Sequence, residues 1–246
     1  MRDCIDTLLT MQNDDGGFAS YEKIRGSALL EYINPAEVFD RIMVEYSYPE
    51  CTTAVLTSLS MFHELDSTYR PSDVKASIAR AVTYIENSQL PDGSWYGSWA
   101  ICFTYATFFA LTSLSTIGQT YATSKRVRHA CKFLLGKQRE DGGWGEHYES
   151  CEVHSYVQCS SQVVNTAWAT LALMHAECPD KSAIERGLRL IKSRQHRNGE
   201  WKQEGVEGVF NRTCMIGYPN YKHYFTVWAL GRYSTSYVPR WQGEHP

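Results

Sequence analysis

Two kinds of helical segment alternate along the chain. In the first kind, apolar residues such as Val74, Ile78 and Ile85 recur three and four positions apart among charged residues, as in amphipathic helices with one solvated face. This pattern predicts outer helices over residues 2–12, 71–89, 124–138 and 181–195. The second kind is apolar on most sides, which is typical of buried helices, and it predicts inner helices over residues 47–65, 98–117, 155–176 and 222–237.

This alternation predicts an all-α fold in which an inner and an outer layer of helices form part of an α/α toroid. No change in composition marks a linker, so we expect a single domain over residues 1–246. The coils at 13–46 and 196–221 are rich in aromatic and polar residues. We expect these coils to reach over the mouth of the toroid.

A short motif follows each predicted outer helix. It has a Gln, a Gly four residues later and a large aromatic residue six residues later, as in Gln12-Gly16-Phe18, Gln89-Gly93-Trp95, Gln138-Gly142-Trp144 and Gln195-Gly199-Trp201. The glycines end the helices and turn the chain. The Gln side chain is suited to bonding the backbone of a neighbouring helix, with the ring stacked over it. We interpret the motifs as structural clamps.

Composition excludes several classes of function. The net charge of −3 argues against a nucleic-acid partner, and no apolar run is long enough to span a membrane. Residues 1–6 are polar and predict no secretory signal. The eight cysteines form no C-x-x-C pair, and no two histidines stand four residues apart. We therefore expect reduced thiols and no metal site.

Aromatic residues make up 13% of the chain and concentrate in the coils and the predicted inner helices. Most such rings belong to the core, but together they are suited to lining a cavity. Aromatic faces hold an apolar ligand and stabilise positive charge without offering a nucleophile. A carbocation, an ammonium ligand and an ordinary apolar ligand all fit this description.

Five segments carry a family resemblance. Residues 93–105 read GSWYGSWAICFTY, and they are joined by residues 16–22, 34–39, 48–52 and 208–214. These segments resemble the triterpene cyclases, most closely the eukaryotic oxidosqualene cyclases of the lanosterol-synthase type, whose QW motif matches the repeated Gln and aromatic pattern. The resemblance implies the C-terminal third of a cyclase with two α/α barrels. The family's proton-donating D-C-T-A-E motif is absent from this sequence and is expected upstream of Met1, which begins inside an outer helix.

The resemblance also implies roles for individual residues. Tyr21 matches a tyrosine on the reprotonation path, and Cys51 matches a cysteine that hydrogen-bonds the catalytic Asp. Trp99 and Phe210 match rings that stabilise cations, and Ile42 matches a position on the route of substrate entry. Tyr218, Phe103 and Tyr105 match residues of the cavity wall. The chain departs from the family pattern at Ala100, Ala106, Phe108 and Thr226, and the two extra methyl groups are expected to crowd helix contacts or narrow the cavity.

The implied function is cyclisation of (S)-2,3-oxidosqualene to lanosterol or a related triterpene alcohol, an isomerisation that needs no metal or cofactor. The implied location is peripheral, at the endoplasmic reticulum membrane or the lipid droplet surface, with an upstream half of the cyclase as partner. One alternative is a catalytically incomplete fragment or pseudoenzyme that binds an apolar ligand or pairs with the missing half. A weaker alternative, a prenyltransferase-like α/α barrel, requires zinc ligands that the sequence does not offer.

Overall fold

The computed structural model describes residues 1–211 and 213–237; Arg212, within the 208–214 segment, lies outside them. The described residues are mostly helical, with one small antiparallel hairpin. The elements in chain order are α1 (Arg2–Met11), η1 (Ala28–Ile33), α2 (Pro49–Leu65), α3 (Pro71–Asn87), α4 (Phe103–Thr116), α5 (Lys125–Lys137), α6 (Glu149–Val153), α7 (Val163–His175), α8 (Lys181–Ser193), β1 (Gly208–Phe210), β2 (Cys214–Ile216), α9 (Tyr221–Arg232) and η2 (Tyr233–Tyr237).

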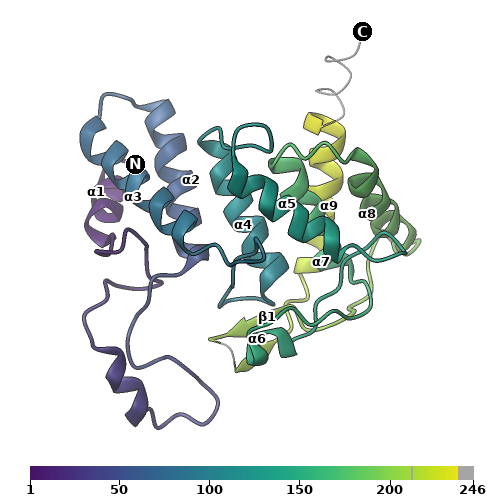
Figure 1. The fold of residues 1–246 in the computed structure, drawn as a ribbon, viewed down its shortest axis with the longest axis horizontal. Helices are drawn as coiled ribbons and strands as arrows, with labels where there is room; N and C mark the ends of the chain where they lie inside the picture. The colour runs from purple at the N-terminus through teal and green to yellow at the C-terminus, as the bar shows by residue number, and fades with distance from the viewer. Residues whose placement is uncertain (212, 238–246) are drawn as a thin grey trace.

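Helices α2, α4, α7 and α9 form the inner layer, each packed against the next. Helices α3, α5 and α8 form the outer layer, against α2, α4 and α7 respectively, and α1 packs on α3; in Figure 1 this arrangement runs from α3 and α2 on one side to α8 on the other. Every residue of α7 is buried, whereas α3 buries one face, through Val74, Ser77, Ala81 and Ile85. The predicted alternation of outer and inner helices, and with it the all-α toroid class, is confirmed.

Two inner helices begin later than the sequence predicts. Helix α4 starts at Phe103 instead of 98, and α7 starts at Val163 instead of 155. The backbone amides before α4 have partners elsewhere: those of Ser98 and Trp99 donate to Glu50, and that of Ile101 donates to the carbonyl of Glu207. A backbone amide committed to a distant acceptor is not free for a helical hydrogen bond.

A helix spans most of residues 222–237 as predicted, but the prediction that it is buried on most sides is wrong. Helix α9 buries only Thr226 and Ala229, and it exposes Tyr224, Val227 and Trp228. It stands at one edge of the inner layer, where it packs against the inner helix α7 and also contacts α8 and η2. Helix α2 stands at the opposite edge and exposes Met61 and Leu65.

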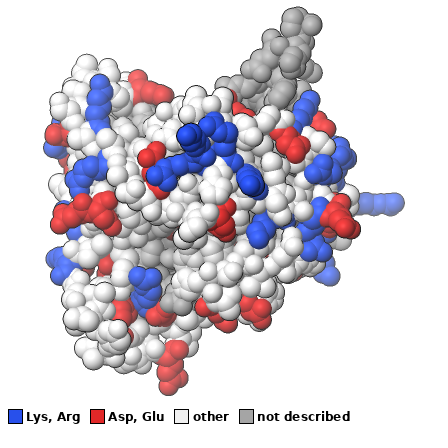
Figure 2. Space-filling model, in the orientation of Figure 1, with Lys and Arg blue, Asp and Glu red and all other residues white. Residues whose placement is uncertain are grey.

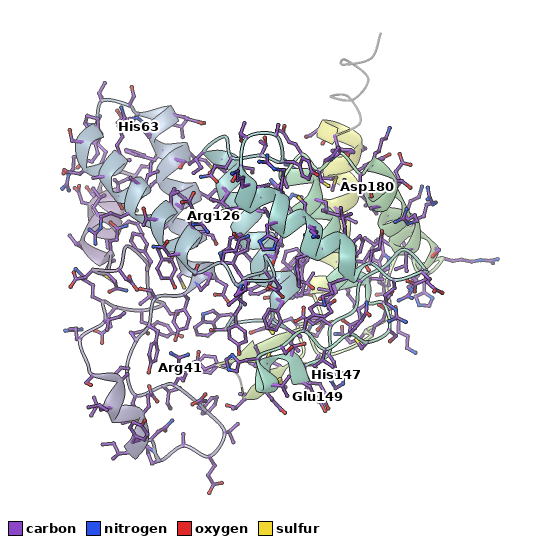
Figure 3. The ribbon with its side chains drawn as sticks, viewed as in Figure 1. Arg41, His63, Arg126, His147, Glu149 and Asp180 are labelled. Atoms are coloured by element: carbon purple, nitrogen blue, oxygen red, sulfur yellow. The ribbon has the colours of Figure 1, made fainter. Side chains whose placement is uncertain are left out.

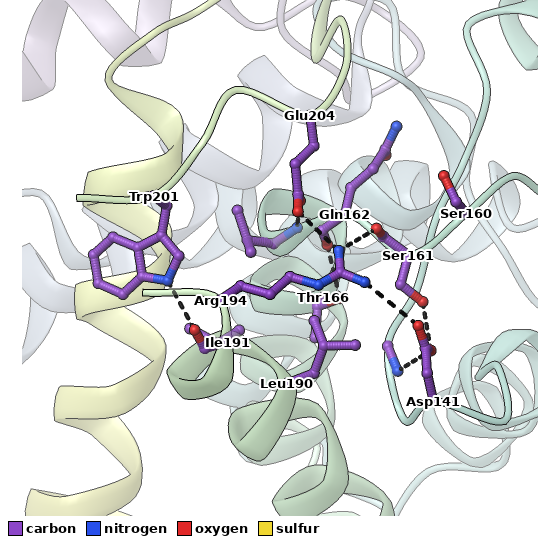
Figure 4. A network of polar contacts seen from close by, with 12 residues as sticks. Asp141, Ser160, Ser161, Gln162, Thr166, Leu190, Ile191, Arg194, Trp201 and Glu204 are labelled. Carbon is purple, nitrogen blue, oxygen red and sulfur yellow. Dashed lines mark hydrogen bonds and ion pairs between the residues drawn. The ribbon is translucent and has the colours of Figure 1, made fainter. Parts of the chain in front are cut away.

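The motif glycines turn the chain with positive φ, +88° at Gly16 and +95° at Gly93. The Gln12, Gln89 and Gln138 amides donate to the motif glycine's carbonyl and to a carbonyl of the next outer helix, at Ser77, Arg126 and Ala183 respectively. The fourth, Gln195, donates to Gly199. Each motif indole donates back to a carbonyl ten residues earlier: Trp95 to Ile85, Trp144 to Leu134 and Trp201 to Ile191 (Figure 4).

Neither coil is featureless. Residues 13–46 project from one end of the helical layers, below α1, α2 and α3 in Figure 1, and they contain the 3₁₀ helix η1. The 196–221 coil contains β1 and β2, which the sequence did not predict. On the face in Figure 2, basic and acidic side chains are interspersed, in keeping with the small net charge.

Candidate functional site

A cavity of about 720 Å³ lies where the projecting coil meets the loop before α4 and the β1–β2 hairpin. Its walls bring together Tyr21, Ile42, Trp99 and Phe210, four residues that the sequence analysis singled out. The other lining residues are Ser20, Glu22, Phe39, Arg41, Met43, Val44, Glu45, Tyr48, Asn211, Cys214 and Ile216. The coil at 13–46 therefore forms a wall of this cavity.

One side of the cavity is a continuous run of aromatic rings. The centroids of Trp99 and Phe210 are 4.8 Å apart at an interplanar angle of 80°. Phe39 packs edge-on against Phe210 with 5.4 Å between the ring centroids, and Tyr48 packs edge-on against Trp99 with 5.9 Å between the ring centroids. We call these four residues the aromatic wall. Their π-faces attract a cation, and their carbon surface accepts an apolar ligand.

Backbone pairing places the two central rings side by side. The amide of Val209 donates to the carbonyl of Trp99 at 3.4 Å, and that of Asn211 to the carbonyl of Ser98 at 3.1 Å. Ala100 and Gly208 form an antiparallel bridge in the same stretch. The loop before α4 therefore pairs with β1, which brings Trp99 against Phe210 although the two residues are far apart in the chain.

A buried carboxyl lies behind the aromatic wall. Glu50, in the first turn of α2, accepts hydrogen bonds at Oε1 from the amides of Ser98 (2.6 Å) and Trp99 (3.0 Å). Its other oxygen, Oε2, is buried with no donor within the described chain. Burial raises the pKa of Glu50 above 4.5, although the amide donors act in the opposite direction.

The two residues expected near the proton source differ in position. Tyr21 lines the cavity and is 73% exposed. Cys51 does not line it; its Sγ lies 3.6 Å from the Oγ of Ser20, which does. Burial raises the pKa of the Cys51 thiol to about 11, so the group is a neutral thiol at pH 7. Cys51 therefore reaches the cavity only through Ser20.

Three residues expected in the cavity wall lie elsewhere. Phe103 and Tyr105 are buried within α4, where Phe103 packs on Tyr96 and Tyr105 on Trp168. Tyr218 stacks on Tyr221 at 4.6 Å, because the bare backbone of Gly208 admits its ring.

The residues that depart from the family pattern also lie away from the cavity. Ala100 and Ala106 are buried in the main core, so their methyl groups do not narrow the cavity. Phe108 packs against Phe225 and Trp228, and the Thr226 hydroxyl donates to the carbonyls of Lys222 and His223.

Three charged residues that the sequence pattern did not predict also line the cavity. Arg41, labelled in Figure 3, has a left-handed backbone (φ 55°) and lays its guanidinium 4.2 Å from the centre of the Tyr46 ring. Glu45 accepts from the amide of Ser20 at 3.2 Å, and Glu22 completes the charged set. A search confined to aromatic residues passes over them, although all three charged residues stand within the 13–46 coil.

Residues 1–211 and 213–237 contain no group of three or more His, Cys, Asp or Glu side chains placed to hold a metal ion. Among the same residues, none of the helices is both long and apolar enough to cross a membrane. All eight cysteines are free thiols.

Comparison with known proteins relates the whole of this architecture to one family. The chain is 57% identical to the lanosterol synthase of Pneumocystis carinii over 239 residues, 53% to that of Saccharomyces cerevisiae over 238, and 46% to the human enzyme over 248. These alignments cover 95–99% of this chain and 32–34% of the relatives. The chain thus spans about a third of their length.

Solved structures share the fold at much lower identity. A type II terpene cyclase from Scytonema bound to merosterolic acid A matches with a TM-score of 0.64 at 15% identity, over 95% of this chain and 66% of that one. The ent-copalyl diphosphate synthase from Streptomyces platensis matches with a TM-score of 0.62 at 19% identity, over 90% and 36%. The model of the squalene-hopene cyclase C-terminal domain matches residues 1–235, and the chain belongs to this family.

Proposed function

We propose that this chain supplies the cavity of an oxidosqualene cyclase of the lanosterol-synthase type. The substrate is (S)-2,3-oxidosqualene and the product is lanosterol or a related triterpene alcohol. The observation that carries the proposal is the aromatic wall of this cavity in a chain 46–57% identical to lanosterol synthases. This level of identity over nearly the whole chain does not favour the alternative of a pseudoenzyme that only binds an apolar ligand.

The chemistry that we propose is an isomerisation. Protonation opens the epoxide and leaves a carbocation, ring closures and hydride and methyl shifts move the charge, and loss of a proton ends the sequence. The contribution of Trp99 and Phe210 is to face the cation with π-clouds, which lower its energy without forming a bond to it. The carbon surface of the aromatic wall offers the cation no water on that side, and water would otherwise capture the cation.

The proton source is a proposal from the resemblance. It is an Asp in a D-C-T-A-E motif, which this sequence lacks, so we assign it to an upstream half of the cyclase. Tyr21 at the cavity and Cys51 behind Ser20 are the residues proposed to face that acid. Two observations support such a partner: the relatives are about three times as long, and α2 and α9 expose apolar side chains at the two edges of the inner layer.

We further propose that the chain is a single cyclase domain and that the enzyme works at the surface of the endoplasmic reticulum membrane or of lipid droplets. An apolar C30 substrate is dissolved in those phases and not in water. Exposed apolar side chains on the coil that walls the cavity, at Leu29, Tyr32 and Ile33, support a route for substrate from such a surface.

The test is a chimera in Saccharomyces cerevisiae. This chain replaces the matching third of the yeast lanosterol synthase in a strain that lacks the native enzyme, and sterols are measured by mass spectrometry. We expect lanosterol or another cyclised triterpene, and at least about a tenfold loss of product with Trp99→Leu or Phe210→Leu, because each removes a cation–π contact. Tyr148→Leu, an exposed ring away from the cavity, serves as the control. A folded chimera without cyclised product would overturn the proposal.

A further inference from the structure

The indole of Trp99 is held differently from those of the motif tryptophans. The Nε1–H groups of Trp95, Trp144 and Trp201 each donate to a backbone carbonyl. The Nε1–H of Trp99 is buried and has no acceptor among the described residues. Its orientation therefore depends on ring packing and on the backbone that carries it.

That backbone is held from two sides. On one side the carbonyl of Trp99 accepts from Val209 in β1. On the other side its amide, with that of Ser98, donates to the carboxyl of Glu50. Glu50 is carried by α2, a helix packed between α3 and α4, and it is absent from the cavity lining. A side chain that touches only the backbone of a cavity residue acts on the cavity through that residue.

The contact between Glu50 and the loop before α4 differs from other acid–amide contacts in the molecule in which element supplies the acid. Two other acidic side chains lie just after a motif tryptophan and accept hydrogen bonds from backbone amides at the start of an inner helix. Glu146 does so at α4, and Glu204 does so at α7 (Figure 4). Helix N-termini gain stability from such acceptors. Glu50 instead reaches from an inner helix to a loop, and the amides it binds carry the central ring of the aromatic wall.

We propose that Glu50 is the positioning residue that fixes Trp99 in the cavity and thereby sets how strongly the aromatic wall holds a cation. The inference rests on the proposed function, because it concerns the same site. Only Oε1 of Glu50 accepts the hydrogen bonds from Ser98 and Trp99. The side-chain carbonyl of Gln can accept the same two bonds, whereas Ala has no acceptor there. We call this pair of hydrogen bonds the anchor. A side chain shorter by one methylene, in Glu50→Asp, falls short of both amides.

The test is a double-mutant cycle on the chain itself, with dodecyltrimethylammonium below its micelle concentration as a probe for an apolar cation. Its dissociation constant is measured by calorimetry for the wild type and for Glu50→Ala, Glu50→Gln, Trp99→Leu and the Glu50→Ala/Trp99→Leu double variant. We expect Glu50→Ala and Trp99→Leu each to weaken binding about fivefold, within the range of cation–π contacts. The double variant should be no weaker than Trp99→Leu alone, and Glu50→Gln should match the wild type.

Several outcomes would overturn the inference. Equal weakening by Gln and Ala means that Glu50 acts by its charge, and additive losses mean that it acts apart from Trp99. If Glu50→Ala does not fold, Glu50→Asp takes its place in the cycle.

A second measurement needs no ligand. Acrylamide quenching assigned to Trp99, by difference from Trp99→Phe, should rise about twofold in Glu50→Ala and stay at the wild-type value in Glu50→Gln. Unchanged quenching in Glu50→Ala would contradict the anchor. Because neither measurement uses catalysis, failure of the chimera to make product and failure of this inference are separate results.

Discussion

The junctions at Glu50 and Glu146 use the same chemistry for different ends. Both place a buried carboxyl group where backbone amides need acceptors. Glu146 uses both oxygens: Oε1 accepts from the amides of Cys102 and Phe103, and Oε2 from that of Thr104. Glu50 uses one oxygen, for Ser98 and Trp99. The first junction begins a helix, and the second fixes a loop at the cavity.

The difference shows how one fold separates stability from function. A fully bonded buried acid contributes to holding the fold, because every donor around it depends on it. A half-bonded one adds less to stability, since its free oxygen is desolvated without return. The half-bonded carboxyl of Glu50 is consistent with a role in which the position of Trp99 matters more than the free energy of unfolding.

The largest expected contrast comes from replacing each acid by its amide. In Glu146→Gln the new NH₂ must face an amide donor whichever way it turns, so we expect a loss of about 3 kcal/mol in the free energy of unfolding. In Glu50→Gln the NH₂ takes the place of the unbonded Oε2, and the loss should stay below about 1 kcal/mol. Urea denaturation measures both, and equal losses would refute the distinction.

Two glycines sharpen the comparison. A Cβ at Gly145 would lie 2.0 Å from the carbonyl oxygen of Ser160, a backbone atom that cannot move aside. At Gly97 a Cβ would meet the Tyr105 ring at 2.8 Å, the backbone carbonyl oxygen of Cys102 at 3.0 Å and Oε1 of Glu50 at 3.1 Å, all longer than the 2.0 Å contact at Gly145. We expect Gly145→Ala to cost about 3 kcal/mol and Gly97→Ala about 1 kcal/mol.

The Gly97 variant also has a functional readout. Because the carboxyl oxygen of Glu50 is one of the three atoms that its methyl group would crowd, Gly97→Ala should weaken binding of the ammonium probe as well, whereas stability alone should fall in Gly145→Ala. Titration of the two variants with the ammonium probe, at a temperature where both remain folded, checks this prediction. Weaker binding in Gly145→Ala with unchanged binding in Gly97→Ala would contradict the prediction.

The smallest expected effect is a pH dependence at Glu50. Burial raises its pKa in the folded state above the ordinary 4.5, so the folded chain binds this proton more tightly than the unfolded chain does. The stabilisation from the protonated form is complete below 4.5 and is lost as the pH rises through the folded-state pKa. Glu50→Gln has no such loss, so its Tm relative to the wild type should increase from pH 4 to pH 8. A constant difference by circular dichroism would contradict this.

The sequence predicted the helical layers because the distribution of apolar positions reports burial, which is one-sided in α3 and complete in α7. It placed the starts of α4 and α7 too early because the backbone amides before them are bonded to distant acceptors: those of Ser98 and Trp99 to Glu50 before α4, and those of Cys159 and Gln162 to the carbonyls of Gly145 and Trp144 before α7. Those partners are distant in sequence and leave no periodic signal. The exposed face of α9 was missed for a related reason, since composition does not reveal which inner helix stands at an edge.

Some residues of the candidate site were also predictable from the sequence, and others were not. Tyr21, Ile42, Trp99 and Phe210 came from the family resemblance, and they meet at one cavity. Tyr218 was expected beside them, but the space left by Gly208 takes its ring toward Tyr221. Glu50 belongs to one of the matching segments, yet its role depends on a contact with a loop about fifty residues away, which only the three-dimensional structure reveals.

The most direct test of the account is the ¹⁹F NMR spectrum of the chain labelled with 5-fluorotryptophan, with the Trp99 resonance assigned by Trp99→Phe. We predict that Glu50→Ala shifts or broadens this resonance and leaves those of Trp144 and Trp201 in place, while Glu50→Gln leaves all of them unchanged. An unmoved Trp99 resonance in a folded Glu50→Ala variant would contradict the claim that Glu50 positions the cavity's central ring.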